Sequence, residues 1–310
     1  MSSMTAQWAI GVDVGGSHVT SSAVDIVELK IIEGTTYTVK VDNKASKEDI
    51  LKNWSKAINQ SIESSGIHDK IKIGFAMPGP FNYKTGLAMF VGNNKKYESL
   101  YNVSIPNEFQ KYLKSFKSDY RFINDATAFG VGVASMGMAK DHSKVVAITL
   151  GTGFGSAFIK NGVPQVNSED VPMGGFMWDK PYKNALGDDY FSTRWCIKRY
   201  KEISGVEATG VREIAEANND NSRKLFIEFG SNMAEFILPF LKKYQPDLIV
   251  LGGNVSKASN FFLPALKCKI QDEGIHVGFE ISDVLEEAAI IGSAKLYDSH
   301  FWEQTQNTIY

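Results

Sequence analysis

An apolar run that ends in two adjacent glycines and a small hydroxyl residue constrains this chain most. Residues 8–14, WAIGVDV, have the content of a buried strand, and Gly-Gly-Ser follows at 15–17. Glycines let a backbone turn tightly and point its amide N–H groups at an anion. Asp13 is suited to hold a divalent cation near that anion. An ordinary hairpin turn explains this segment equally well.

Two later segments repeat the pattern. Residues 145–159 are rich in β-branched residues, contain LGTGFG, and lead into Asn-Gly at 161–162, which is a hairpin signal. Residues 246–255 read PDLIVLGGNV. Three strand–glycine units predict two similar halves folded around one nucleotide. The chain contains neither GxxxxGK[ST] nor GxGxxG, which disfavours P-loop and Rossmann nucleotide sites.

The composition excludes several classes of protein. The 310 residues suffice for two domains with separate cores, and 43% hydrophobic with 22% charged residues is ordinary for a globular protein. A net charge of −2 gives no bulk attraction to nucleic acid or to an anionic membrane. No signal peptide and no apolar stretch of the ~20 residues that span a membrane are recognisable, so we expect a cytoplasmic protein. Cys196 and Cys268, far apart in sequence, predict reduced thiols.

Periodicity and capping signals predict alternating strands and helices, which is an α/β arrangement. A loop over 81–104 is long enough to suggest a functional role. We expect a smaller domain over 1–122 that is completed by 288–310, and a larger domain over 123–287. The expected helices span 46–66, 106–116, 126–138, 188–203, 210–217, 221–244, 258–273 and 285–298, and the expected strands after the first hairpin span 35–41, 70–76, 120–123, 145–160, 247–251 and 276–280.

Five short segments, taken in order, resemble the ROK family of sugar kinases. They are DVGGS at 13–17, MPGP at 77–80, NDA at 124–126, LGTGFG at 150–155 and LGGNVS at 251–256. Each is weak alone, but five in the family's order and approximate spacing are specific, and they extend over most of the chain. The resemblance implies the actin-like ATPase (ribonuclease H-like) fold, in which two similar α/β domains surround a central cleft for nucleotide and sugar.

The resemblance also implies an activity, which is glucokinase-like phosphorylation of a hexose hydroxyl by ATP with Mg²⁺. Asp125 would be the catalytic base, because a carboxylate there can accept the proton of the attacking hydroxyl. Asn124 and Asp125 are also favoured helix-capping residues, so a purely structural role stays open. Polyphosphate is an alternative phosphoryl donor.

The matching positions assign the binding residues. Asp13 is expected to hold Mg²⁺, through water. The implied sugar contacts are Gly79, Asn93, Asn94, Asn124, Glu169 and Asp188. The implied nucleotide contacts are Asp13, Gly15, Gly16, Ser17, Gly151, Thr152, Gly153, Gly252, Gly253 and Asn254.

The chain departs from the family at its zinc motif. Most ROK kinases carry a cysteine-rich C-x-C-G-x-x-G-C run preceded by a G-E-x-G-H segment, whereas the first cysteine here is Cys196, so no zinc site is expected. Phe176 stands where the family has its sugar-binding Glu, and Asp179 where it has His. Zinc-free polyphosphate glucokinases supply that Glu from an N-T-E stretch, and Glu169 falls at the matching distance from Gly151. A solvated loop position explains Glu169 equally well.

The main alternative to a kinase is a sugar-binding sensor with weak or lost activity. Many ROK proteins are repressors that carry a winged helix-turn-helix ahead of the first phosphate turn, and twelve residues precede Asp13 here. Nucleic acid and membrane are therefore not expected partners, whereas small-molecule sugar and nucleotide are. The resemblance also implies a homodimer.

Overall fold

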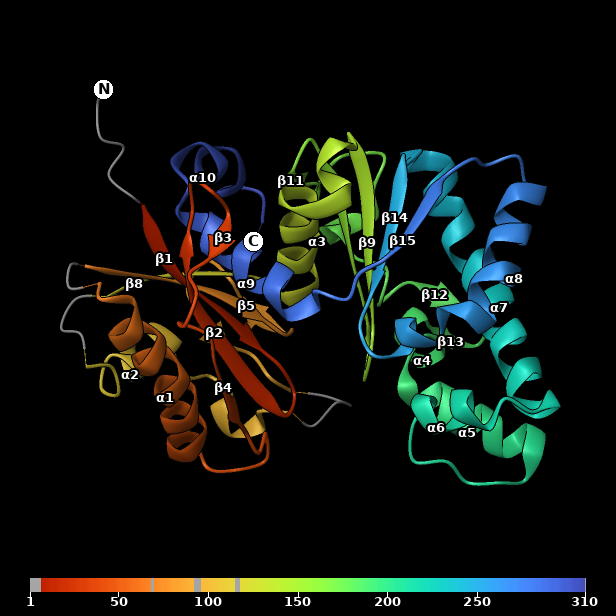
Figure 1. Cartoon of the computed structure of the whole chain (residues 1–310), viewed down its shortest axis with the longest axis horizontal. Helices are drawn as coiled ribbons and strands as arrows, with labels where there is room; N and C mark the ends of the chain where they lie inside the picture. Colours follow the sequence, from red (N-terminus) through yellow and green to blue (C-terminus); the bar gives the residue numbers. More distant parts are fainter. Residues whose placement is uncertain (1–6, 68–69, 92–95, 115–117, 310) are drawn as a thin grey trace. The chain divides into compact units, whose positions relative to one another are not determined.

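The computed structural model describes residues 7–67, 70–91, 96–114 and 118–309 (Figure 1). The chain forms two compact units. Unit 1 comprises Met1–Gly137 and Glu286–Tyr310, and unit 2 comprises Met138–Leu285.

Unit 1 is built on a six-stranded sheet of order β3-β2-β1-β5-β8, with β4 beside β2. β1 and β2 form an antiparallel hairpin, and β5 and β8 continue the sheet in parallel with β1. A separate short pair, β6 and β7, is antiparallel. The strands are β1 (Trp8–Val14), β2 (His18–Asp25), β3 (Lys30–Ile31), β4 (Tyr37–Lys40), β5 (Ile71–Met77), β6 (Phe81–Asn82), β7 (Leu87–Ala88) and β8 (Ser118–Asn124).

Helices cover both faces of this sheet. Successive residues of β1 point to opposite faces, so neighbouring side chains pack against different helices. Ile10 packs in one cluster with Trp54 of α1 (Lys47–Ser65), whereas Ala9 packs in another with Ile290 of α9 (Leu285–Ala294). Ser46 caps α1 as predicted, by accepting a hydrogen bond from the Asp49 N–H at 3.2 Å. The remaining helices of unit 1 are α2 (Ile105–Phe109), α3 (Asp125–Ser135), α10 (Ser299–Thr305) and the 3₁₀ turns η1 (Glu98–Leu100) and η5 (Lys295–Tyr297), with η2 (Gly137–Asp141) at the junction of the units.

Helices α3 and α9 approach closely through glycines. A Cβ added at Gly132 would lie 1.9 Å from the carbonyl oxygen of Ala288, and one at Gly292 would lie 2.0 Å from that of Ala128. The glycines at these two positions therefore allow the helices to pack closely. The same contacts hold α3 in unit 1, whose first segment ends at Gly137.

Unit 2 repeats the plan of unit 1 with a five-stranded sheet of order β11-β10-β9-β14-β15. An antiparallel hairpin, β9 with β10, is again followed by two parallel strands, β14 and β15. The prediction of two similar α/β halves is therefore confirmed. The strands are β9 (Lys144–Leu150), β10 (Phe154–Lys160), β11 (Val163–Pro164), β14 (Leu248–Gly252) and β15 (Gly278–Ile281), with a separate hairpin of β12 (Pro181–Tyr182) and β13 (Ala185–Leu186).

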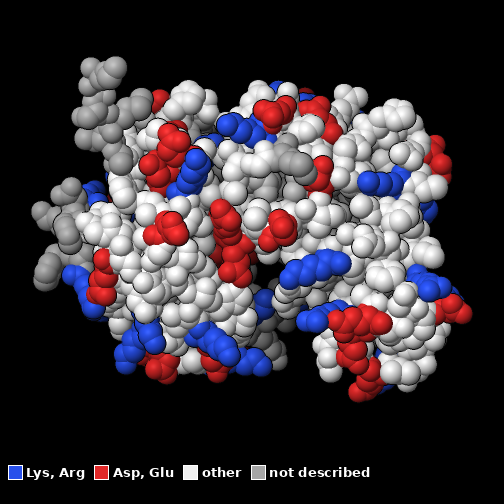
Figure 2. Space-filling view, viewed as in Figure 1, with Lys and Arg blue, Asp and Glu red and all other residues white. Residues whose placement is uncertain are grey.

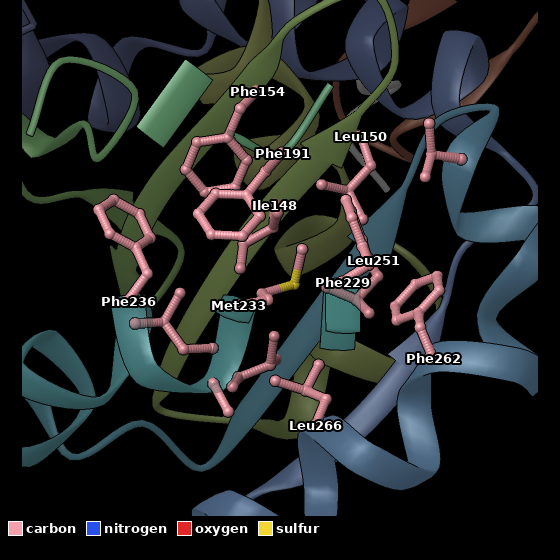
Figure 3. Close-up of a cluster of buried hydrophobic side chains, with 14 of the residues drawn as sticks. Ile148, Leu150, Phe154, Phe191, Phe229, Met233, Phe236, Leu251, Phe262 and Leu266 are labelled. Atoms are coloured by element: carbon pink, nitrogen blue, oxygen red, sulfur yellow. The ribbon is translucent and has the colours of Figure 1, made fainter. Parts of the chain in front are cut away.

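The core of unit 2 lies between its sheet and two long helices, α7 (Asp220–Tyr244) and α8 (Ser259–Asp272). Figure 3 shows Phe229 and Met233 of α7 clustered with Ile148 and Leu251 of the sheet. The other helices are α4 (Gly187–Tyr190), α5 (Thr193–Ser204), α6 (Val211–Ala217) and the 3₁₀ turns η3 (Met173–Gly175) and η4 (Val255–Ala258).

Three predicted helices differ from those of the structure, and of these the one expected over 188–203 is two helices, α4 and α5. The one expected over 106–116 ends at Phe109, because the following backbone bonds to α1 instead: Asn59 donates to the Tyr112 carbonyl at 3.0 Å, and its Oδ1 accepts from the Lys114 N–H at 3.1 Å. The one expected over 285–298 is α9 continued by η5, and a further helix that was not expected, α10, begins after Asp298, which caps it by accepting from the Phe301 N–H at 2.7 Å.

Figure 2 shows acidic and basic side chains interspersed over the visible face of the molecule. Among the described residues, no helix combines the length and apolar character needed to cross a membrane.

Candidate functional site

The loop over 15–17 joins β1 to β2 in unit 1, and donors from elsewhere in the unit bind its carbonyl groups. The Tyr97 hydroxyl donates to the Gly15 carbonyl at 2.5 Å, Asn43 Nδ2 donates to that of Gly16, and the Val41 N–H donates to that of Ser17 at 2.9 Å. Within the described part of the chain, nothing accepts a hydrogen bond from the N–H of Gly16 or Ser17. Those two amides are therefore available donors of the kind that a phosphate requires.

The glycines of this turn provide space and not an unusual backbone conformation. Neither Gly15 nor Gly16 has a positive φ. A Cβ at Gly16 would lie 3.1 Å from Lys96 Nζ, and one at Gly15 would lie 3.1 Å from the His18 carbonyl oxygen. A side chain at either position would crowd the groups that line the turn.

Asp13 ends the strand that leads into the turn and is partly buried. Burial, followed by the negative charges of Asp125 and Glu286, raises its pKa to about 8. A divalent cation would offset this accumulation of negative charge. One carboxylate completed by water and phosphate oxygens is a ligand set that Mg²⁺ accepts, so the residues fit that ion. Among the described residues, no three His, Cys, Asp or Glu side chains gather as a metal site.

Asn124 and Asp125 lie where β8 passes into α3. Asn124 is the N-cap: its Oδ1 accepts from the Thr127 N–H at 3.1 Å. Its Nδ2 donates to Asp125 Oδ1 at 3.0 Å, and the Ala126 N–H donates to the same oxygen at 2.8 Å. The capping role is thus present, and it also fixes the Asp125 carboxylate. The sugar contact of Asn124 remains a prediction.

Tyr83 links this corner to the turn after β5. Its hydroxyl donates to the Met77 carbonyl at 3.2 Å and accepts from Asn124 Nδ2 at 3.2 Å. The same hydroxyl lies 3.6 Å from the position of a Cβ at Gly79, so Gly79 and Asn124 lie on the same side of unit 1. The predicted sugar residues Asn93 and Asn94 are outside the described residues.

A residue near the other end of the chain also reaches the first turn. Glu286 of α9 contacts His18 Nε2 at 2.9 Å and accepts from the Thr20 hydroxyl at 3.0 Å. His18 Nδ1 in turn lies 3.1 Å from Ser17 Oγ. Helix α9 therefore supports the turn through a chain of polar contacts.

The second turn, 151–153, joins β9 to β10 in unit 2 and is supported by α4 and α5. The Gly151 carbonyl accepts from the Thr193 N–H at 2.8 Å and from its hydroxyl at 2.9 Å. The Thr152 carbonyl accepts from Arg194 at 2.7 Å. As in unit 1, donors from outside the turn hold its carbonyl groups.

Asp188, a predicted sugar contact, uses both carboxylate oxygens at this turn. Oδ1 accepts from the Phe154 N–H at 2.7 Å, and Oδ2 pairs with Arg194 at 2.8 Å. A Cβ at Gly153 would lie 2.7 Å from Asp188 Oδ1, which explains the glycine there. The carboxylate is thus engaged within unit 2, and its contact with sugar remains a prediction.

The third glycine segment lies beside the second turn. β14 pairs with β9 so that Gly252 is opposite Thr149. Gly253 has a φ of +94°, and a Cβ there would lie 2.3 Å from the Leu150 carbonyl oxygen, so only glycine fits. Asn254 follows at the start of η4. The structure thus brings the predicted residues 151–153 and 252–254 together within unit 2.

Glu169 is not brought to this turn. It is exposed, and the adjacent Asp170 pairs at 3.4 Å with Lys144, the first residue of β9. The turn follows the last residue of that strand, about 20 Å away at ~3.3 Å per residue. Phe176 lies closer to the turn along β10, because the next residue, Met177, donates its N–H to Ser156 Oγ at 2.8 Å.

Several residues that contact or lie near these turns belong to no recognisable sequence motif. The motifs identify the glycines and the acids that follow strands. They do not identify the residues that bind the turns from distant elements, which are Asn43, Tyr97 and Arg194. They also miss three residues that lie near the predicted site in unit 1: Tyr83, Lys96 and Glu286. Each of these is an ordinary polar or aromatic residue outside any motif.

Two units with the same hairpin-and-parallel-strand topology, each carrying a glycine turn at its first hairpin, define an actin-like ATPase fold. The ROK family model matches residues 9–169, just over half of the 310 residues, and the chain belongs to the ROK family.

Sequence relatives within that family are sugar kinases. The chain is 24% identical over 320 residues to the glucokinase of Thermotoga maritima, covering 93% of this chain and 96% of the relative. It is 26% identical over 274 residues to the N-acetyl-D-glucosamine kinase of Haemophilus influenzae, covering 79% and 84%.

Solved structures give the same fold. The ROK hexokinase of Thermus thermophilus matches with a TM-score of 0.76 at 17% identity, covering 96% of this chain and all of that one. The ROK family glucokinase of Streptomyces griseus, in complex with glucose and AMPPNP, matches with a TM-score of 0.68 at 19% identity, covering 94% and 99%.

Proposed function

We propose that the protein transfers a phosphoryl group from ATP, with Mg²⁺, to a hydroxyl of a hexose. The observation that carries this proposal is the Asp125 carboxylate, fixed at the start of α3 and electrostatically coupled to Asp13 at the first glycine turn. A carboxylate held beside a phosphate-binding turn is what a kinase acting on an alcohol needs.

Asp125 is the general base in this mechanism. Its Oδ1 already accepts from Asn124 and Ala126, so Oδ2 accepts the proton of the attacking hydroxyl. Burial raises the pKa of Asp125, while the Ala126 N–H and the charge of Lys96 oppose that rise. A carboxylate with a raised pKa is a stronger base, provided that it remains ionised at the working pH.

The two turns bind the donor through their backbone. The Gly16 and Ser17 amides in unit 1 and the 151–153 turn in unit 2 donate to phosphate oxygens, and Gly252, Gly253 and Asn254 complete the nucleotide-binding part of unit 2. Asp13 holds Mg²⁺ through water, and the ion, when bound, neutralises triphosphate charge.

The sugar is a hexose or an N-acetylated hexose. Both classes occur among the relatives, which include a glucokinase and an N-acetyl-D-glucosamine kinase. Phe176, an aromatic face where the family has an acid, supports a substrate with fewer hydroxyls at that edge. Glu169, at the opposite end of β9 from the turn, is less well placed for the sugar.

The test is a panel of sugars scored by coupled ADP release, with Asp125→Asn as the variant. We expect turnover on at least one hexose and a loss of at least about 100-fold in kcat in the variant, with sugar affinity nearly unchanged. Wild-type kcat should fall as the pH drops through a pKa above the ordinary carboxyl range, because the base must be ionised.

Asp119→Asn on the same strand is the matched control, since Asp119 is an exposed carboxylate paired at 3.8 Å with Lys70. More than a tenth of wild-type turnover in Asp125→Asn would contradict the assignment of the base. Tight sugar binding without any ADP release from the wild type would instead indicate the sensor.

A further inference from the structure

The side chain of Lys96 lies along the first phosphate turn. From the position that a Cβ would occupy at Gly16, the distances are 3.1 Å to Nζ, 3.2 Å to Cε and 3.6 Å to Cδ of Lys96. The end of this side chain therefore covers Gly16. The ammonium group therefore lies beside the residue that carries one of the two available amides of the turn.

The backbone at Lys96 is held to the same turn by the next residue. Tyr97 is fully buried, and its hydroxyl donates to the Gly15 carbonyl at 2.5 Å. Its N–H donates to the Asn43 carbonyl at 2.8 Å, and its ring packs edge-on against Trp54 at 5.3 Å. These contacts fix the residue after Lys96 beside the first turn.

Among the described residues, carboxylates lie on this side of unit 1. The negative charges of Asp125 and Glu286 each act on Asp13 and raise its pKa. Lys96 lies close enough to Asp125 for its charge to lower the pKa of that carboxyl. A phosphoryl group that approached Asp125 would meet carboxylate repulsion, and the ammonium group of Lys96 would offset it.

We infer that Lys96 is a phosphoryl-binding catalytic residue, whose ammonium group contacts the phosphoryl group during its transfer to the sugar. The inference rests on the proposed kinase function and goes beyond it by naming the cation. A bond forms between the sugar oxygen and the γ-phosphorus, and the bond from that phosphorus to the β–γ bridging oxygen breaks. The hydroxyl proton passes to Asp125, and Lys96 stays protonated while it donates to the oxygens of the transferring group.

The first test compares Lys96→Met, which keeps the aliphatic stem and removes the charge, with Lys96→Arg, which keeps the charge. We expect Lys96→Met to lower kcat by about 100-fold, as for loss of one preorganised donor, with sugar KM within twofold of the wild type. Lys96→Arg should recover at least a tenth of the wild-type kcat. Lys44→Met, at an exposed lysine beside Asn43, is the matched control and should be as active as the wild type.

A second readout does not depend on sugar turnover. Binding of ADP with Mg²⁺ is measured by calorimetry in the presence and absence of aluminium fluoride, which mimics a phosphoryl group in transfer. We expect aluminium fluoride to tighten ADP binding to the wild type, and Lys96→Met to lose at least tenfold of that gain while its affinity for ADP alone stays within twofold.

The two proposals fail in different ways. Absence of turnover on every sugar, together with the aluminium fluoride effect and its loss in Lys96→Met, would reject the kinase and keep the lysine contact. Equal binding of the aluminium fluoride complex by wild type and Lys96→Met, or a kcat within threefold of wild type in Lys96→Met, would overturn the inference.

Discussion

Replacing Asp188 tests whether this residue contacts the sugar, as the sequence predicts, or supports the second turn, as its hydrogen bonds indicate. Its carboxylate receives the Phe154 N–H and pairs with Arg194, which also donates to the Thr152 carbonyl. If these bonds define its function, Asp188→Ala loosens the second turn. The unfolding temperature and the affinity for ATP should then fall, whereas the affinity for sugar should stay the same.

The magnitude follows from the two bonds. Phe154 is 3% exposed, so its N–H in Asp188→Ala loses a charged acceptor at a buried position, at a cost of roughly 1.5–3 kcal/mol. The Arg194 side chain is 48% exposed, so the ion pair adds only about 0.2–1 kcal/mol. Together they amount to about 2–4 kcal/mol, or a fall of about 4–16 °C in the unfolding midpoint of a unit this size. Asp188→Asn retains an acceptor and should lose less than half of that.

The assay combines thermal unfolding with initial rates at varied ATP and varied sugar. We expect both Asp188 variants to raise the KM for ATP severalfold while leaving the KM for sugar within twofold. Asp189→Ala is the control on the same helix. It removes an exposed carboxylate that accepts from the Leu186 N–H at 3.1 Å, and it should lower the free energy of unfolding by about 1 kcal/mol or less. A tenfold rise in sugar KM at unchanged unfolding temperature would refute this reasoning and restore Asp188 as a sugar contact.

Two further predictions follow from packing and placement. Glu169→Gln should leave the sugar KM unchanged, and a tenfold rise would contradict the placement of Glu169 away from the second turn. Phe176→Glu should improve the use of glucose over N-acetylated sugars in the same panel. Gly132→Ala should lower the free energy of unfolding by about 1–3 kcal/mol in urea, because the added methyl would lie 1.9 Å from the Ala288 carbonyl oxygen. Gly210→Ala, with open space around it and an extended φ of −175°, is the control and should change stability by less than about 1 kcal/mol.

The parts of the fold that sequence reasoning predicts are those that local chemistry dictates. The β1–β2 and β9–β10 hairpins follow from apolar strands that end in glycines, and α1 follows from Ser46 at its N-cap and Gly66 in the left-handed conformation at its end. The repeat of these signals along the chain was enough to predict two similar halves. Each of these features depends on residues within a few positions of one another.

The parts that sequence reasoning misses depend on contacts between distant residues. Glu286 contacts His18 across 268 positions, and Tyr97 reaches Gly15 across 82. The end of α2 at Phe109 reflects Asn59, which binds the following backbone more than fifty residues away in sequence. Glu169 illustrates the same limit, because its spacing from Gly151 matches a family pattern while the neighbouring Asp170 pairs with Lys144 at the other end of β9.

The two turns share a topology but are held by different chemistry, and this difference assigns them different tasks in the proposed reaction. In unit 1 the donors to the turn carbonyls are Tyr97, Asn43 and a backbone amide, all neutral. Near that turn stand carboxylates and a lysine, the groups that a proton transfer and a moving phosphoryl charge require. In unit 2 the support includes the ion pair of Asp188 with Arg194, and Gly252 and Gly253 lie beside the turn. In the proposed reaction, unit 1 would therefore supply the base and the lysine in addition to two backbone amides for the donor, and unit 2 would contribute backbone donors alone.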